Sequence, residues 1–242
     1  MPGTADPFLA QLEELAATDP FVPTRSLINL RDAGVVPGSR LPKGRFYRCG
    51  TLDYAAKDPQ ALAWLAAKVT RIFDLQKGVE REHGLDPVVE GVENAWLDGQ
   101  GEYPSLTLDD FVADGGRPAW REQYLAIVSC YQPTIRALLE HIRGRPAHPI
   151  LFHCTAGRDR TGVVAGLLQH LAGTPAGLAC LDYMLSRIGA EPAREKLLHF
   201  ALSTAGTTDP RAPGFRNLIS LRPEFWSGSR ASKENTADGT AT

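Results

Sequence analysis

Residues 149–173 constrain the fold more than any other part of the sequence. A short apolar strand ending at His153 is followed by a small polar loop at 154–160 and then by an apolar helix that ends near Gly173. A strand that leads through a tight loop into a helix is typical of α/β proteins, which bind ligands at the carboxyl ends of their parallel strands. The sequence therefore predicts a ligand site at residues 154–160.

The rest of the chain alternates helices with short strands. A capping side chain followed by proline predicts a helix start, and this pattern occurs at Asp6-Pro7, Asp58-Pro59 and Thr174-Pro175. An amphipathic helical pattern covers residues 118–143, and Pro133 is expected to kink or split it. Strands are predicted at residues 45–49, 69–75, 92–97 and 150–153.

This alternation predicts a single α/β domain with a central, mostly parallel sheet of four to five strands and helices on both faces. The 242 residues are 43% hydrophobic, which is enough to fill the core of one domain. We expect a helical extension at residues 1–24 and the folded domain at 25–226. The small, polar residues 227–242 are expected to form a disordered tail.

The composition argues against several classes of protein. The formal net charge is −2 at pH 7, so no overall cationic field attracts nucleic acid, and we expect no nucleic-acid partner. The first residues lack the pattern of a secretory signal, and no apolar run reaches the roughly 20 residues of a membrane span. We therefore expect a cytoplasmic monomer without a transmembrane segment.

The four cysteines are Cys49, Cys130, Cys154 and Cys180, and they form neither CxxC pairs nor zinc-binding spacings. We expect no metal site and no cofactor. Cys130 and Cys180 lie in apolar helical patterns, where a free thiol is most often a small buried hydrophobe. Cys154 differs from these because it lies at the start of the predicted ligand loop.

The loop at residues 154–160 has the features of an anion site. Successive backbone N–H groups can curl around a tetrahedral anion, and the following helix points its positive end at the same place. Gly157 permits a positive φ in the turn, and Arg160 can bind two phosphate oxygens as a fork. The candidate phosphate-binding residues are Thr155, Ala156, Gly157, Arg158, Asp159 and Arg160.

Cys154 is the candidate nucleophile of this loop. A cysteine beside a helix N-terminus and a guanidinium ionises readily, and the thiolate can attack phosphorus to form a phosphocysteine. Thr161 follows the arginine directly, so its hydroxyl can donate a hydrogen bond to the thiolate. His153 is expected to orient the loop through its ring nitrogens.

The string HCTAGRDRTG at residues 153–162 resembles the phosphate-binding loop of the protein-tyrosine phosphatase superfamily, in the branch whose loop reads HCxAGKDRTG. That branch includes bacterial tyrosine phosphatases of the B type and related fungal proteins. Residues 26–32, 44–50 and 73–81 resemble upstream motifs of the same branch, in the same order. The resemblance covers roughly residues 26–190 and implies a protein-tyrosine-phosphatase-like fold and activity.

The resemblance also implies supporting roles for Arg31, Asp32 and Arg48, although ordinary ion pairing would explain them equally well. The chain departs from the family pattern at three positions, where lysine, serine and arginine are replaced by Arg158, Cys49 and Gln76. These changes bear on the substrate class, because the nucleophile and the Cys-to-Arg spacing are intact. If Cys49 lies beside the loop, it could form a protective disulfide with oxidised Cys154, although a buried strand residue is the simpler interpretation.

Two aspartates are candidates for the general acid that protonates the leaving oxygen. Asp98 directly follows a predicted strand and is flanked by glycine, as a mobile catalytic loop would require, although an Asp-Gly pair can also simply form a turn. Asp159 lies inside the loop, where the resemblance implies a role. Its alternative role is structural, as an ion-pair partner of Arg158 or of the region around Arg31 and Arg48.

The sequence therefore predicts a cysteine-dependent phosphatase that acts on phosphotyrosine or on mixed phospho-residues of proteins. Phosphoinositides or small phosphorylated metabolites are the alternative substrates, since the sequence does not give the depth of the site. A non-catalytic phosphate-binding module is a further alternative, which the retention of both Cys154 and Arg160 disfavours.

Overall fold

The computed structural model describes residues 14–24, 26–82, 84–97 and 106–224. The chain divides into two compact units, one formed by residues 1–100 and 131–193 and the other by residues 101–130 and 194–242. The expected division into an extension, a domain and a tail stays a prediction, since most of residues 1–24 and all of 227–242 lie outside the described ranges.

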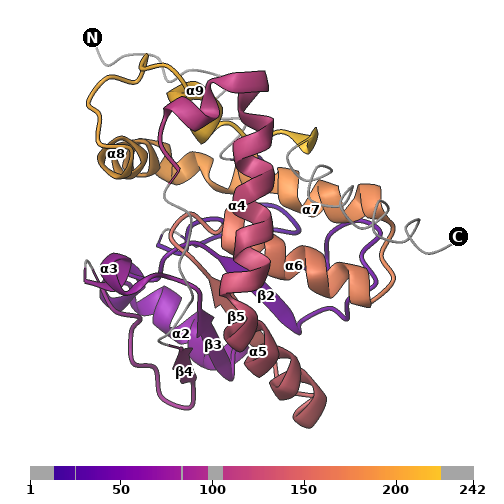
Figure 1. The fold of residues 1–242 in the computed structure, drawn as a ribbon. Coiled ribbons are helices and arrows are strands. Elements are labelled where there is room, and N and C mark those ends of the chain that lie inside the picture. The colour runs from indigo at the N-terminus through magenta and orange to yellow at the C-terminus, as the bar shows by residue number, and fades with distance from the viewer. Residues whose placement is uncertain (1–13, 25, 83, 98–105, 225–242) are drawn as a thin grey trace, which may run out of the picture. The chain divides into compact units, whose positions relative to one another are not determined.

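The first unit contains a five-stranded sheet with the order β1-β2-β5-β3-β4 (Figure 1). β1 is antiparallel to β2, and the other three neighbouring pairs are parallel. The expected mostly parallel sheet of four to five strands is confirmed. The two-residue strand β1 was not anticipated, because two residues carry no periodicity. The strands are β1 (Arg31–Asp32), β2 (Phe46–Cys49), β3 (Arg71–Asp74), β4 (Glu93–Trp96) and β5 (Ile150–His153).

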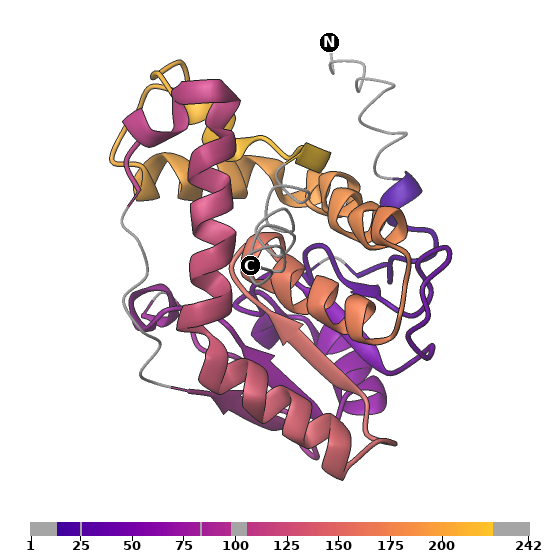
Figure 2. The ribbon, with the colours of Figure 1, turned by 45° about the vertical axis from the view of Figure 1, so that its right-hand side comes forward.

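Helices cover both faces of this sheet, as the alternation of elements predicts (Figures 1 and 2). Along β3, Ile72 packs into a core with Leu65 of α2, while the next residue, Phe73, contacts the ring of His141 of α5 at 5.9 Å on the other face. The helices of this unit are α2 (Pro59–Lys68), α3 (Gly78–Arg81), α5 (Gln132–Gly144), α6 (Asp159–Leu171) and α7 (Ala176–Gly189).

Two of the predicted helix signals act as expected. The side chain of Asp58 accepts hydrogen bonds from the first backbone amides of α2, which satisfies donors that the helix itself leaves unpaired. Pro133 lies in the first turn of α5, and α4 (Arg117–Cys130) ends before it, so the long amphipathic pattern is split there.

The expectation that Thr174 caps α7 is wrong. The hydroxyl of Thr174 donates instead to Gln169 Oε1 at 2.6 Å and accepts from the amide of Arg40 at 3.0 Å. These two bonds engage the hydroxyl that would otherwise cap the helix. The N-cap residue is Pro175, and no side chain caps α7 there.

The register of the sheet brings four residues together at the carboxyl edge. Cys49 and Asp74 flank His153 on either side, and Trp96 is the next neighbour beyond Asp74. The loops that leave β2, β3, β4 and β5 therefore start side by side. The candidate ligand loop follows His153 directly, so the sheet places it among these loops.

The second unit is small, and its core is aromatic. The ring of Trp120 in α4 contacts Phe111 edge-on and Tyr124 at a tilt, and its indole N–H donates to the carbonyl of Asn217 at 3.1 Å. Its other elements are 3₁₀ turns at Asp109–Phe111 and Ala113–Gly116 and the helices α8 (Arg194–Thr204) and α9 (Phe215–Ile219). Across the described ranges, no helix has the length and apolar character needed to cross a bilayer.

The core beneath the sheet should dominate the stability of the first unit. Leu65 is fully buried between α2 and the sheet, so Leu65→Ala should lower the free energy of unfolding by about 2–5 kcal/mol. Chemical denaturation measures this loss. Leu171→Ala is the matched control, because Leu171 is 61% exposed on a helix and should change stability by less than about 0.5 kcal/mol. Equal effects of the two variants would contradict the described packing.

Candidate active site

The candidate loop joins the end of β5 to the first turn of α6. Cys154 follows β5 directly and is only 2% exposed, at the base of the loop. The hydroxyl of Thr161, in the first turn of α6, donates to Cys154 Sγ at 3.1 Å. This contact places a hydroxyl donor directly against the sulfur atom of the candidate nucleophile.

Gly157 fixes the shape of the loop. Its φ is +64°, and a Cβ atom there would overlap the backbone of Cys49 and Gly50, so only glycine fits. The carbonyl oxygen of Gly157 accepts hydrogen bonds from Asn29 Nδ2 and Arg48 Nη2, each at 2.9 Å. The loop is therefore held against β2 and against the chain before β1.

A buried ion cluster positions Arg48, which contacts the loop. Asp182 of α7 accepts from Arg48 Nη1 at 2.7 Å and from Arg31 Nε at 2.8 Å, and both guanidinium groups are fully buried. Burial alone would raise the pKa of Asp182, but the charges and hydrogen bonds of Arg48 and Arg31 lower it. Arg31 also donates to Ser186 Oγ at 3.0 Å. The cluster ties α7 to β1 and β2.

The guanidinium of Arg160 is oriented before any ligand binds. Its Nη1 donates to the carbonyl of Leu75 at 2.9 Å, and its Nη2 donates to Glu80 Oε1 at 2.6 Å. Burial acts to raise the pKa of Glu80, but the hydrogen bonds and charge of Arg160 and the hydrogen bond from Thr155 lower it to about 2. Glu80 is thus a carboxylate at neutral pH, and it fixes the direction of the arginine fork.

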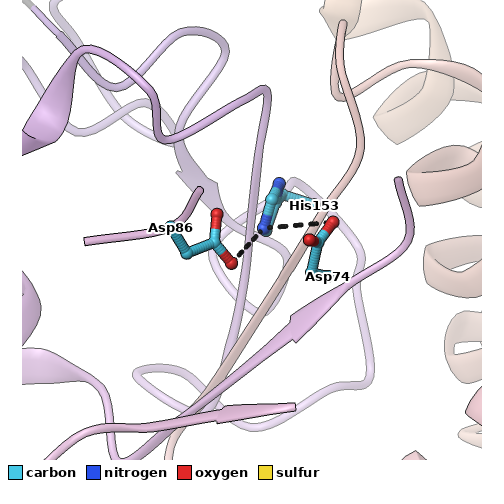
Figure 3. Close-up of side chains that lie close together, drawn as sticks. All are labelled: Asp74, Asp86 and His153. Atoms are coloured by element: carbon cyan, nitrogen blue, oxygen red, sulfur yellow. Dashed lines mark hydrogen bonds and ion pairs between the residues drawn. The ribbon is translucent and has the colours of Figure 1, made fainter. Parts of the chain in front are cut away.

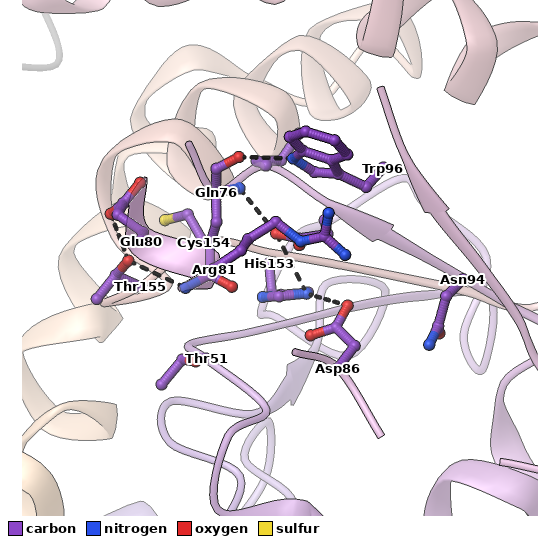
Figure 4. Close-up of polar contacts among 12 residues, drawn as sticks. Thr51, Gln76, Glu80, Arg81, Asp86, Asn94, Trp96, His153, Cys154 and Thr155 are labelled. Atoms are coloured by element: carbon purple, nitrogen blue, oxygen red, sulfur yellow. Dashed lines mark hydrogen bonds and ion pairs between the residues drawn. The ribbon is translucent and has the colours of Figure 1, made fainter. Parts of the chain in front are cut away.

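Glu80 also reaches the loop itself. Thr155 Oγ1 donates to Glu80 Oε1 at 2.5 Å, and Gln76 Nε2 donates to Thr155 Oγ1 at 3.3 Å (Figure 4). The carbonyl of Gln76 accepts from the indole of Trp96 at 3.0 Å. Gln76, which replaces the family's arginine, therefore remains part of the frame around the loop.

His153 is enclosed by carboxylates (Figure 3). Its Nε2 lies 3.0 Å from Asp86 Oδ2 and 3.7 Å from Asp74 Oδ1, and the three side chains are at most 4% exposed. Burial alone would lower the pKa of His153, but Asp86 and Asp74 together raise it to about 9. A pKa of about 9 favours the protonated ring at neutral pH, in which Nε2 faces the two carboxylates and Nδ1 has no hydrogen-bond partner among the described residues.

The remaining candidate residues have different positions. Arg158 Nε donates to both carboxylate oxygens of Asp159 at 3.0 Å. This ion pair is one of the structural roles that the sequence leaves open for Asp159. Asp32 accepts from the amides of Gly34 and Gly44, so it supports the turns around β1 and β2. Asp98 lies outside the described residues.

Cys49 lies beside the loop, as a disulfide with Cys154 would require. It is fully buried, it is the register partner of His153, and both Cys49 and Cys154 are free thiols in this structure. Burial raises the pKa of Cys49 well above its usual value. A buried thiol that resists ionisation is a poor attacking group, and a role for Cys49 in redox protection stays a hypothesis.

Sequence reasoning identified the loop but missed most of its partners. Asp182 could have been noticed as the one acidic residue inside the apolar pattern at 176–188. Glu80 lies within the family-like motif at residues 73–81, but nothing in the sequence signals its contact with Arg160. Asp86 lies in an irregular segment with no signal of its own. All three act through contacts between segments far apart in the chain.

Loss of the Asp182 charge should destabilise the protein strongly. Asp182→Asn keeps the shape of the side chain but leaves two buried guanidinium groups without their carboxylate, which costs about 3–5 kcal/mol. Denaturant unfolding measures the change. The control is Asp109→Asn, at an exposed position, which should be nearly neutral. A loss below about 1 kcal/mol for Asp182→Asn would contradict the described cluster.

Comparisons with known proteins add to this geometry. The tyrosine phosphatase family matches residues 22–241 of the chain. A tyrosine-protein phosphatase from Nostoc commune is 40% identical over 65 residues, which are 27% of this chain and 22% of that protein, so the chain matches about a fifth of that relative's length. A crystal structure of TpbA from P. aeruginosa is 16% identical, with 85% of this chain and 91% of that chain covered, at a TM-score of 0.33.

The family match confirms the resemblance that the loop and the upstream motifs indicate. Because it extends over most of the sequence, the chain belongs to the tyrosine phosphatase family.

Proposed function

We propose that the protein is a cysteine-dependent phosphatase that hydrolyses phosphate monoesters through a phosphocysteine intermediate. The observation that carries this proposal is the loop from Cys154 to Arg160, in which a buried sulfur receives a hydrogen bond from Thr161 and the arginine is oriented by a carboxylate. The backbone amides of such a loop and the N-terminus of α6 would bind the phosphate between these two side chains.

In the first step, Cys154 Sγ attacks phosphorus in line with the ester oxygen. The S–P bond forms while the P–O bond to the leaving group breaks, and a general acid transfers its proton to the departing oxygen. The fork of Arg160 balances the charge on the phosphoryl oxygens, and its pairing with Glu80 removes the need to reorient it during the reaction.

In the second step, water attacks phosphorus and the S–P bond breaks. The aspartate that gave its proton now accepts one from the water, and inorganic phosphate leaves. The thiolate is the leaving group, so the Thr161 hydroxyl, which already donates to Cys154 Sγ, stabilises the charge that returns to sulfur.

We propose Asp98 as the general acid, with Asp159 as the alternative. β4 ends at Trp96 on the same sheet edge as the loop, and Asp98 follows only two residues later in the sequence. Asp159 is paired with Arg158 at 3.0 Å, so its carboxylate is already engaged by a neighbouring side chain of the loop.

The proposed substrates are phosphotyrosine or mixed phospho-residues of proteins. Membership of the tyrosine phosphatase family supports this class. We further propose that residues 25–226 form the phosphatase domain, and that the protein acts as a cytoplasmic monomer. Hydrolysis of phosphotyrosine peptides in preference to soluble short-chain phosphoinositides would support the substrate class, and the reverse preference would overturn it.

Replacement of the nucleophile tests the covalent mechanism. Cys154→Ser should lower the hydrolysis of p-nitrophenyl phosphate by about 10⁴-fold or more, because an alcohol at this position is not ionised. Cys180→Ser, at a half-buried position on α7, is the matched control and should retain full activity. Substantial turnover by Cys154→Ser would contradict the mechanism, and an inactive wild type would favour a binding module.

Two leaving groups of different basicity identify the general acid. Asp98→Asn should lower kcat/KM for phenyl phosphate by about 10²–10⁴-fold and for p-nitrophenyl phosphate by much less, since kcat/KM reports the step that breaks the ester and nitrophenolate leaves without a proton. The falling limb of its rate at high pH should also disappear. Asp159→Asn should show neither effect. If Asp159→Asn alone discriminates between the two esters, the acid is Asp159, and if neither does, both assignments are wrong.

A further inference from the structure

The carboxylates around His153 come from two separate segments, and both are buried. Asp74 ends β3, whereas Asp86 lies in the irregular segment between α3 and β4. The Asp86 side chain is 4% exposed and the His153 side chain is fully buried, with 3.0 Å between Asp86 Oδ2 and His153 Nε2. Placing a carboxylate next to a buried imidazole is costly unless the imidazole carries a proton, because the two charges then compensate each other.

We propose that Asp86 is a positioning residue: together with Asp74 it holds His153 as an imidazolium next to the Cys154 nucleophile, so that a buried positive charge supports the thiolate. The role given to Asp86 has a purpose only if the proposed phosphatase function is correct. Its test is independent of that function, because the ionisation of His153 and Cys154 can be measured without a substrate.

The charges that face His153 support the protonated form. Asp74 approaches from β3 and Asp86 from the segment after α3, while Arg81 of α3 pairs with Asp74 at 2.9 Å. With His153 protonated and both aspartates ionised, two carboxylates meet one guanidinium and one imidazolium, and the group is neutral as a whole. A divalent cation in place of the proton would leave an excess of buried positive charge beside Arg81.

The other titratable neighbours are two thiols. Cys49 is the register partner of His153 on β2, and Cys154 follows His153 in the chain. Burial keeps Cys49 neutral, so under this proposal the thiol that ionises on this side is Cys154, and its thiolate would interact favourably with the imidazolium of His153. By linkage, an imidazolium that is stabilised by the thiolate stabilises the thiolate by the same amount.

The effect of Asp86→Asn on the reactivity of Cys154 has opposite signs in the two possible cases, so its direction discriminates between them. Asp86→Asn removes a negative charge, which by simple electrostatics should make the thiolate easier to form. If Asp86 acts through His153, the ring loses its proton near neutral pH, and the thiolate loses the positive charge beside it. The variant should then react more slowly with alkylating agents, not faster.

The experiment measures the rate at which iodoacetamide alkylates Cys154 at pH 7.5, by mass spectrometry of the peptide that contains it. We expect Asp86→Asn to be roughly three- to tenfold slower than wild type, as the thiolate fraction falls toward that of an ordinary cysteine. Asp86→Glu should recover most of the rate. Glu90→Gln, which removes an exposed charge from the same segment, is the control and should match wild type.

A double-mutant cycle shows whether the effect passes through His153. His153→Gln should also slow alkylation, and Asp86→Asn should add no further loss in that background. An equal loss in both backgrounds, or a faster reaction of Asp86→Asn, would overturn the proposal. A stoichiometric metal in the purified wild-type protein that Asp86→Asn lacks would overturn it as well.

A second measurement uses only the wild-type protein, in case the variants do not fold. The ring resonances of His153, followed by NMR, should remain those of an imidazolium up to pH 8, because Asp86 and Asp74 raise its pKa to about 9. The stabilisation from this shift is present below about pH 6.5 and is lost as the pH rises through about 9. A neutral ring at pH 7 would overturn the proposal.

These outcomes separate the inference from the proposed function. An active wild type whose Asp86→Asn variant alkylates normally would refute the role of Asp86 and leave the phosphatase proposal standing. A wild type that hydrolyses no phosphate ester, yet shows both ionisation signatures, would refute the phosphatase proposal and leave the ion cluster standing.

Discussion

The site depends first on one buried carboxylate, that of Asp182. It neutralises part of the charge of Arg31 and Arg48, two guanidinium groups that no water reaches. Because a buried charge is tolerated only with a partner, Asp182 is what allows Arg48 to lie under the loop and to bind the Gly157 carbonyl. The geometry around Cys154 therefore rests on a helix residue that does not touch the proposed phosphate position.

The same principle recurs on the other side of the loop. Glu80 fixes Arg160, and Asp86 with Asp74 encloses His153, so each cationic group near Cys154 has a buried or half-buried carboxylate behind it. Such pairing keeps the side chains in one orientation before a substrate arrives. The proposed phosphate site is thus preorganised by ion pairs that are contributed by α3, β3, α7 and the segment before β4.

The sequence predicted the parts of this site that are local. The strand, the loop and the helix at 150–171 follow from a continuous apolar pattern interrupted by a polar loop with glycine. Asp182 and Asp86 could not be assigned this way, since their partners are distant in the chain and their roles appear only after folding. Thr174 was misassigned because its hydroxyl bonds instead to Gln169, five residues earlier, and to the amide of Arg40, far away in the chain.

The central claim is that the sulfur of Cys154 carries the phosphoryl group between ester and water. Rapid acid quenching of the wild-type protein during its incubation with an aryl phosphate, followed by mass spectrometry of its peptides, tests this most directly. The account predicts a phosphate on Cys154, present in the first turnover and absent after the substrate is exhausted. A phosphate on another side chain, or steady hydrolysis with the Cys154 peptide unmodified at every quench time, would contradict it.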